Sequence, residues 1–389
     1  MSKIIQLFKL NIDYSNRIFG LDLLRFFAIF FVLQDHAGRF VPKILLPYYN
    51  ILRYDGVGIF FVLSGFLIGG ILFKQLNKYK FDANFLIDFW IRRWMRTLPN
   101  YFLFLVMLLI FYKLINQEFI IVDKLSYFIF LQNIYSGELD FFGESWSLAV
   151  EEWFYISLPL LMFFFNFFLK SKGKSFLLSS IIVLIVCQCF RFQLFFNNSD
   201  YVNYNHTVLG RLDSIFWGVL AAYLFQNYVR YWNKYKYINL LLGIILLIQF
   251  KVDLLSVNIS PLYKSTYTSL TIFLCLPYFN SLKTFSNRKV LKFVCYISLI
   301  SYSIYLVNSQ VSNFLSSGIN WNIIVSIMRD ELNLRNDLNI WPILLIINFM
   351  LFFVLTILIS TLIYKYYEIP MTKLRDLPFF KNRLKKTLK

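Results

Sequence analysis

The sequence of 389 residues is poor in charge, with 4 cysteines and only 2 histidines. Charged residues make up 15% of the chain, whereas 58% are hydrophobic and 21% aromatic, and the mean hydropathy is +0.59. A soluble domain needs a polar exterior, for which this chain has too little charge. The composition therefore excludes a soluble domain and predicts an all-α integral membrane protein.

Several kinds of site and segment are also missing from the sequence. No His/Cys/Asp/Glu cluster has metal-ligand spacing, and there is no Walker A loop or GxGxxG fingerprint, so we expect no metal. No internal repeat, low-complexity linker or appended soluble domain is visible, and no cleavable signal peptide precedes the first hydrophobic segment. We predict one membrane domain over 1–375 and a basic cytoplasmic tail over 376–389.

Long hydrophobic segments dominate the rest of the chain. Their lengths predict a bundle of about ten transmembrane helices, at approximately 19–38, 56–73, 98–115, 146–168, 175–194, 210–228, 236–250, 265–282, 294–314 and 341–364. A further apolar stretch, 122–135, is too short to span and is predicted to be interfacial or re-entrant.

The basic residues predict an orientation. The chain has 39 Lys and Arg against 21 Asp and Glu, a net charge of +18. With a cytoplasmic N-terminus, most of the basic residues fall in the two tails and the even-numbered connections, so the positive-inside rule places both termini in the cytoplasm. We attribute the excess to topology and anionic lipid and expect no nucleic-acid partner. Abundant Phe, Ile, Asn and Lys indicate an AT-rich genome, and we expect a bacterial inner membrane.

Arg25 and His36 stand eleven residues apart in LDLLRFFAIFFVLQDHAG. On a helix this spacing places them within roughly 20° of one face and about 16 Å apart. Both side chains are costly in lipid, so they indicate a functional face turned into the protein. The alternative is that Arg25 reaches the headgroups and His36 is merely interfacial.

The run IRRWMRTLP places Arg93 and Arg96 at the predicted inner end of the third span. Two guanidiniums on one helical face suit a phosphorylated ligand, because Arg binds phosphate oxygens in pairs. The alternative is a basic cluster that only sets topology.

Two further motifs place charges at the outer ends of predicted spans. Glu151 and Glu152 lie in ESWSLAVEEWFYISLP, and carboxylates inside a span must pair, protonate or face a hydrated cavity. Arg211 and Asp213 in GRLDSIFWG could partner them, or could form a simple interfacial ion pair.

Three remaining motifs have a more structural character. In GVGIFFVLSGFLIGG, Gly65 and Gly69 form a GxxxG pattern, which allows close helix packing. SYSIYLVN ends at Asn308, and YYEIP contains Glu368, which we expect to fix the last helix at the interface.

These motifs, in this order and spacing, resemble acyltransferase family 3, a family of membrane proteins that move acyl groups from a coenzyme A thioester to extracytoplasmic carbohydrates and related acceptors. The resemblance extends from about residue 17 to 375. It implies ten core helices, an essential His in the first span, here His36 with Arg25, and an Arg pair linked to the acyl donor, here Arg93 and Arg96. Many relatives end the SYxxYLxH motif with His, where this chain has Asn308. Other members carry an extra periplasmic domain, so we expect this chain to act alone or with a separate periplasmic acyl-handling protein.

The residues and the resemblance together give a mechanistic hypothesis. Acyl-CoA, expected to be acetyl-CoA, enters from the cytoplasm with its phosphates on Arg93 and Arg96, and its pantetheine arm reaches toward His36. His36 acts either as a general base on an acceptor hydroxyl or as an acyl-carrying nucleophile. Glu151 is the candidate for tuning His36, and Arg25 for holding the channel or donor. The residues expected to contact substrate are Glu152, Arg211, Asp213 and Asn308.

The expected acceptor is a carbohydrate such as a surface polysaccharide or a lipopolysaccharide O-antigen. The main alternative is a transporter or flippase of a polysaccharide precursor, in which buried Arg, His and Glu would form a path. Such proteins often have repeated halves with broken helices, and this sequence shows neither. A membrane scaffold is disfavoured by the buried charges.

Overall fold

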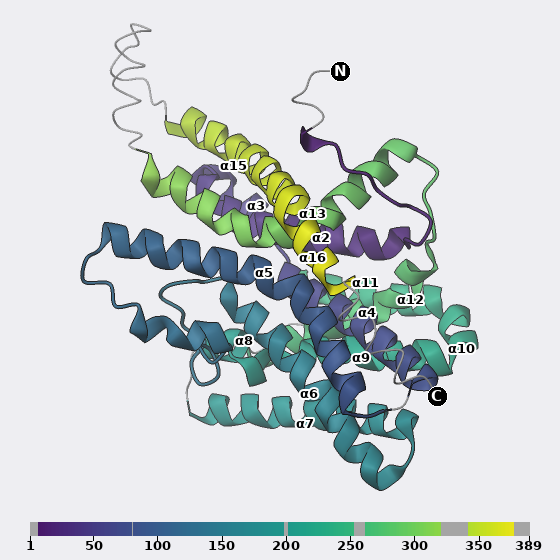
Figure 1. Ribbon diagram of the computed structural model, residues 1–389. Coiled ribbons are helices and arrows are strands. Elements are labelled where there is room, and N and C mark those ends of the chain that lie inside the picture. The colour runs from purple at the N-terminus through teal and green to yellow at the C-terminus, as the bar shows by residue number, and fades with distance from the viewer. Residues whose placement is uncertain (1–6, 80, 198–200, 253–260, 320–340, 377–389) are drawn as a thin grey trace, which may run out of the picture.

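The structure, a computed structural model, describes residues 7–79, 81–197, 201–252, 261–319 and 341–376, and is dominated by helices (Figure 1). The long helices in these ranges are α2 (Phe19–Ala37), α4 (Gly56–Lys78), α5 (Ala83–Ile115), α6 (Ser145–Leu169), α7 (Lys172–Phe196), α9 (Val208–Asn227), α11 (Lys236–Val252), α12 (Pro261–Ser281), α13 (Arg288–Asn313) and α15 (Trp341–Ile363). Short helices include α3 (Leu46–Leu52), α8 (Tyr201–His206), α10 (Val229–Lys234), α16 (Ile369–Lys373) and the 3-10 helix η3 (Val122–Ile129).

Each predicted span overlaps one of the long helices, which confirms the all-α membrane architecture. Within the described ranges, 7 helices are long and apolar enough to cross a membrane, namely α4, α5, α6, α7, α9, α13 and α15. Helix α2 carries Asp22, Arg25 and Asp35, α11 has only 17 residues, and α12 is more polar. The number of ten spans therefore stays a prediction.

The helix that contains the third predicted span begins well before that span. Helix α5 begins at Ala83, where the carboxylate of Asp82 accepts a hydrogen bond of 2.9 Å from a backbone amide of the first turn. It continues through Pro99 to its end. Arg93 and Arg96 consequently lie in the middle of a long helix and not at its start.

The helices form two neighbouring groups, and α5 lies along both (Figure 1). Helices α2, α13 and α15 share one apolar core, and α4, α6, α7 and α9 share another. Helices α4 and α9 cross with their backbones in contact: a Cβ on Gly65 would lie 1.9 Å from the carbonyl oxygen of Ile215, and one on Gly218 would lie 1.9 Å from that of Val62. The predicted close packing at Gly65 is therefore present, and it fixes the position of α4.

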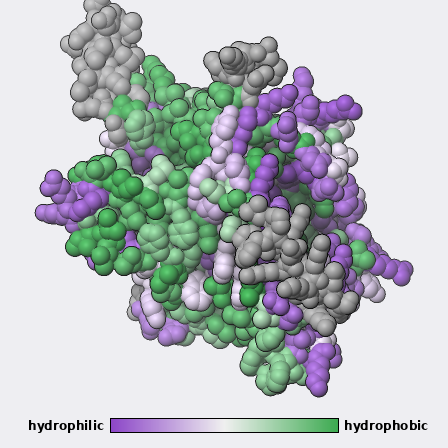
Figure 2. Space-filling view, viewed as in Figure 1, coloured by the Kyte–Doolittle hydropathy of each residue, from purple (hydrophilic) through white to green (hydrophobic). Residues whose placement is uncertain are grey.

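Figure 2 shows hydrophobic side chains over the left and centre of the bundle, and hydrophilic side chains mainly at the right, with smaller groups at the left and lower edges. Helix α5 contributes Met107, Ile110, Phe111 and Leu114 to the exposed surface. An exposed apolar band of this kind fits an integral membrane protein.

The short segment 122–135 folds back onto α5 and α6. Its backbone accepts a hydrogen bond of 2.8 Å from the Tyr101 hydroxyl at Tyr127, and one of 2.9 Å from Trp153 Nε1 at Phe130. Its helix η3 has 8 residues, so the prediction that this stretch does not span is confirmed.

The predicted orientation can be tested with single cysteines. Lys78 is exposed at the end of α4, and Glu138 is exposed in the connection before α6. Cysteines at these positions should react with an impermeant maleimide from opposite faces of the membrane, because the two connections follow successive spans. The background should lack Cys189, which is exposed. Labelling of both from the same face would contradict the predicted topology.

Candidate active site

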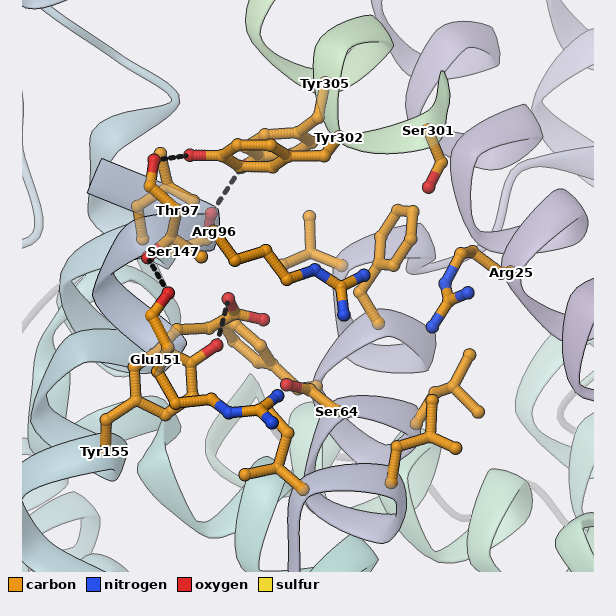
Figure 3. A pocket seen from close by; sticks show the side chains of 18 of the residues that line it. Arg25, Ser64, Arg96, Thr97, Ser147, Glu151, Tyr155, Ser301, Tyr302 and Tyr305 are labelled. Carbon is orange, nitrogen blue, oxygen red and sulfur yellow. Dashed lines mark hydrogen bonds between the residues drawn. The ribbon is translucent and has the colours of Figure 1, made fainter. Parts of the chain in front are cut away.

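A cavity of about 310 Å³ lies among helices α2, α4, α5, α6 and α13 (Figure 3). The lining side chains are Arg25, Val57, Phe60, Phe61, Leu63, Ser64, Leu67, Ile68, Ile71, Arg93, Arg96, Thr97, Ser147, Leu148, Glu151, Tyr155, Ser301, Tyr302 and Tyr305. The cavity thus brings together residues from five helices that are far apart in the sequence.

Basic side chains outnumber acidic ones in this cavity. Arg25 from α2 and Arg96 from α5 reach into it from opposite sides (Figure 3), and Arg93 lines it one turn before Arg96. Glu151 is the acidic residue in the lining. In the described part of the chain, the Arg93 and Arg96 guanidiniums have no carboxylate partner, and the buried Nε of Arg93 has no hydrogen-bond partner. A multivalent anion would supply the negative charge and the hydrogen-bond acceptors that these guanidiniums lack.

Glu151 and its neighbour Glu152 face different surroundings. Glu151 accepts hydrogen bonds from the Tyr155 hydroxyl at 3.2 Å and from the Ser64 hydroxyl, and it lies within electrostatic range of the cavity arginines. Glu152 is buried on the other side of α6, where it accepts a bond of 2.9 Å from Trp94 Nε1 and another of 2.9 Å from Thr97 Oγ1. Glu152 therefore ties α6 to α5 beside a separate apolar cavity of about 350 Å³.

The cavity is elongated along α4. Its lining positions on that helix run from Val57 to Ile71, which is about 21 Å of helix. Tyr155 lies at one end, and the hydroxyls of Ser147 and Tyr305, 2.6 Å apart, lie at the other (Figure 3). The guanidiniums occupy the middle and the Tyr155 end, so the cavity has a cationic part and a hydroxyl-lined end.

His36 lies just beyond the hydroxyl-lined end. It is in the last turn of α2, its ring is half-buried, and its backbone carbonyl accepts a bond of 3.2 Å from Ser312 Oγ. The start of α4 packs on α2 about one turn before His36, because a Cβ on Gly56 would lie 2.9 Å from the backbone nitrogen of Val32. His36 therefore stands about one turn past Val57. It makes no contact with Glu151 among the described residues.

A family model described as an acyltransferase domain matches residues 18–365 of the chain. The chain belongs to acyltransferase family 3. The resemblance seen in the motifs is therefore confirmed over most of the sequence.

Three curated relatives are similar to parts of this acyltransferase-family chain. YrhL of Bacillus subtilis (strain 168) is 32% identical over 185 residues, covering 43% of this chain and 27% of YrhL. O-acetyltransferase OatA of Staphylococcus aureus (strain NCTC 8325 / PS 47) is 26% identical over 235 residues, covering 55% of this chain and 36% of OatA. Peptidoglycan O-acetyltransferase OatA of Listeria monocytogenes serovar 1/2a (strain ATCC BAA-679 / EGD-e) is 33% identical over 132 residues, covering 30% of this chain and 21% of that protein. The chain thus aligns with about a third or less of each relative, and no solved structure matches it significantly.

Arg211 and Asp213 of the family 3 chain do not pair with each other or with Glu151. Arg211 forms an ion pair with Asp55, the N-cap residue of α4, and Asp213 forms a fully buried ion pair with Arg191 of α7. Each pair joins α9 to a neighbouring helix. The expected pairings were wrong because the partners come from helices whose neighbours a single sequence does not reveal.

Asn308 is fully buried in α13, outside the cavity lining. Its Nδ2 donates to the carbonyl oxygens of Ile304 at 3.1 Å and Tyr305 at 2.7 Å, and its Oδ1 has no partner in the described structure. It therefore presents an unused acceptor near the hydroxyl-lined end.

Glu368 is buried in the protein. It accepts bonds from Asn100 Nδ2 at 3.0 Å and Ser303 Oγ at 2.6 Å. The expectation that it fixes the last helix agrees with these contacts, which hold the chain after α15 against α5 and α13. The local sequence did not indicate that Glu368 would be buried between these helices.

Several polar cavity residues had no role in the sequence prediction, namely Ser64, Thr97, Ser147, Tyr155, Ser301, Tyr302 and Tyr305. Helical spacing could have found two of them, since Thr97 follows Arg93 by four residues and Ser147 precedes Glu151 by four. Among the described residues, no group of three or more His, Cys, Asp or Glu side chains could hold a metal ion. The predicted tail over 376–389 lies almost wholly outside the described residues.

Proposed function

We propose that this protein is a membrane O-acyltransferase that moves an acetyl group from acetyl-CoA to a hydroxyl of an extracytoplasmic carbohydrate. The observation that carries the proposal is the set of three guanidiniums around one carboxylate in a cavity inside a bundle of apolar helices. Membership of acyltransferase family 3 and two relatives named as O-acetyltransferases support it. The acceptor class is a surface glycan, such as a polysaccharide, a lipopolysaccharide O-antigen or peptidoglycan.

The cavity fits the donor in size and charge. At about 310 Å³ it is at the small end for ligand pockets, so it suits the pantetheine arm better than a whole coenzyme A. Arg93 and Arg96 would hold the phosphates, and the apolar wall of α4, with Leu67 and Phe60, would receive the neutral arm. The thioester would then lie near the hydroxyls of Ser147 and Tyr305.

The residues at the far end provide the chemistry of transfer. The acceptor oxygen attacks the thioester carbonyl, a C–O bond forms, and the C–S bond breaks. His36 takes the hydroxyl proton and passes it to the coenzyme A sulfur, or first carries the acetyl group itself; both routes give an ester and a free thiol. The hydroxyls of Ser147 and Tyr305 would donate to the oxyanion that develops on the carbonyl.

Purified protein in proteoliposomes tests this proposal. With radiolabelled acetyl-CoA and surface glycan isolated from a deletion strain, label should appear on the glycan, with one free coenzyme A thiol for each ester formed. Movement of glycan across the membrane without thiol release would instead support the transporter alternative. A separate periplasmic partner is indicated if thiol release occurs but the label does not reach the glycan.

A further inference from the structure

A second polar cluster, with two buried members and one partly buried member, lies directly behind the hydroxyl-lined end of the cavity. It consists of Glu144, Asn308 and Ser309, and we call it the outer polar cluster. Glu144 is the residue before α6 and is only 6% exposed, and Asn308 is fully buried. The Tyr305 hydroxyl joins the cluster to the cavity, because it lies 2.6 Å from Ser147 Oγ and 3.2 Å from the carbonyl oxygen of Glu144.

The outer polar cluster and His36 contact the same face of α13. The Ser309 hydroxyl donates to the Glu144 carboxylate, and Ser312 Oγ donates to the His36 carbonyl oxygen at 3.2 Å. Ser309 and Ser312 are three residues apart on α13, and side chains at this spacing lie about 5–6 Å from each other. Glu144 and His36, their respective partners, are therefore held at adjacent positions. The charge of Arg39 acts on both side chains, which agrees with this placement.

The cluster has more hydrogen-bond acceptors than donors. Among the described residues Glu144 forms no ion pair, and the buried Oδ1 of Asn308 has no partner. Buried acceptors without donors are costly, so this arrangement favours a ligand that brings hydroxyl groups. Burial raises the pKa of Glu144, whereas the Ser309 hydrogen bond and the Arg39 charge oppose that rise.

The cluster lies next to an exposed position of the chain. Gly143, next to Glu144, is exposed, and a Cβ built on it would meet no atom within 4 Å. Gly143 is on the side of the bundle away from the Tyr155 end of the cavity, which the predicted topology assigns to the extracytoplasmic face. An acceptor could therefore approach from the face opposite to the donor.

We propose that Glu144 is an acceptor-binding residue whose carboxylate accepts a hydrogen bond from a carbohydrate hydroxyl and holds a hydroxyl of that sugar toward His36. Asn308 Oδ1 would accept from a second hydroxyl of the same sugar. This inference rests on the proposed acetyl transfer. Glu144 transfers no proton in this reaction, because the hydroxyl proton still goes to His36.

The test is a steady-state comparison of the full chain with its Glu144→Gln variant, using acetyl-CoA and surface glycan from a deletion strain. A hydrogen bond to a charged group is worth enough that the KM for glycan should rise roughly ten- to a hundredfold. The KM for acetyl-CoA should stay within about twofold. Glu144→Asp, which keeps the charge, should recover part of the loss, and Glu138→Gln in the exposed connection is the matched control.

Unchanged KM for glycan in Glu144→Gln would overturn the inference, as would a rise confined to the KM for acetyl-CoA. If Glu144→Gln fails to fold, Ser309→Ala is the second variant, because it removes only the hydroxyl that donates to the carboxylate. It should raise the KM for glycan by a smaller factor and leave the KM for acetyl-CoA unchanged. An unchanged KM for glycan in Ser309→Ala would also overturn the inference. A wild-type protein that releases no thiol with glycan present would instead remove the proposed function itself.

Discussion

His36→Ala should abolish acetyl transfer while leaving expression and membrane insertion near wild type. An imidazole that moves a proton in the transition state contributes about a hundred- to ten-thousandfold to a rate, and its loss here leaves no other imidazole at the hydroxyl-lined end. The side chain is half-buried at the end of α2, so its removal creates little cavity. The measurement is thiol release from acetyl-CoA with glycan present.

The other histidine supplies a matched control. The His206 ring packs on the Trp146 ring with centroids 4.5 Å apart, and it does not line the cavity. His206→Phe keeps a ring in that position and should retain transfer. If His36→Ala keeps most of the activity, the catalytic assignment fails.

Arg93→Ala and Arg96→Ala should each weaken coenzyme A binding by roughly ten- to a hundredfold, because charge-assisted hydrogen bonds are worth about 1.5–3 kcal/mol each. Lysine at either position should restore only part of the affinity, since it keeps the charge but not the fork. His36→Ala should leave the affinity nearly unchanged. Titrations of coenzyme A and of its dephospho form against these variants in nanodiscs measure the effect.

Arg92 is the control within the same helix. It forms an ion pair with Asp88 at 2.8 Å and does not line the cavity. Arg92→Lys keeps a charge opposite that buried carboxylate and should bind coenzyme A like wild type. If Arg93→Ala and Arg96→Ala also bind like wild type, the two arginines serve only topology.

Features governed by local sequence were predictable. The apolar runs predicted the ten long helices. The cost of charged side chains inside apolar segments indicated that Arg25 and Glu151 face the protein interior, and both line the cavity. The early start of α5 was also predictable, because Asp82 is a recognisable N-cap residue.

Features governed by helix packing were not predictable from one sequence. The pairing of Asp213 with Arg191, and of Arg211 with Asp55, depends on which helices become neighbours. The different surroundings of Glu151 and Glu152 were predictable, because consecutive residues on a helix point in different directions. Glu144 was overlooked because nothing in its local sequence shows that α13 will cover it.

Helix α5 has 33 residues and is about 50 Å long, well beyond the roughly 30 Å of hydrocarbon in a bilayer. Arg96 lies about 20 Å from its start, and the remaining part, 97–115, is about 28 Å long and can cross the hydrocarbon alone. The phosphates of a donor held at Arg96 would then stay at the headgroup level, and only the uncharged arm would enter the membrane. A charge that crosses the whole bilayer gains or loses about 2.3 kcal/mol per 100 mV, but a neutral arm does not. Acetyl transfer by this protein should therefore proceed at the same rate whether or not the membrane is energised.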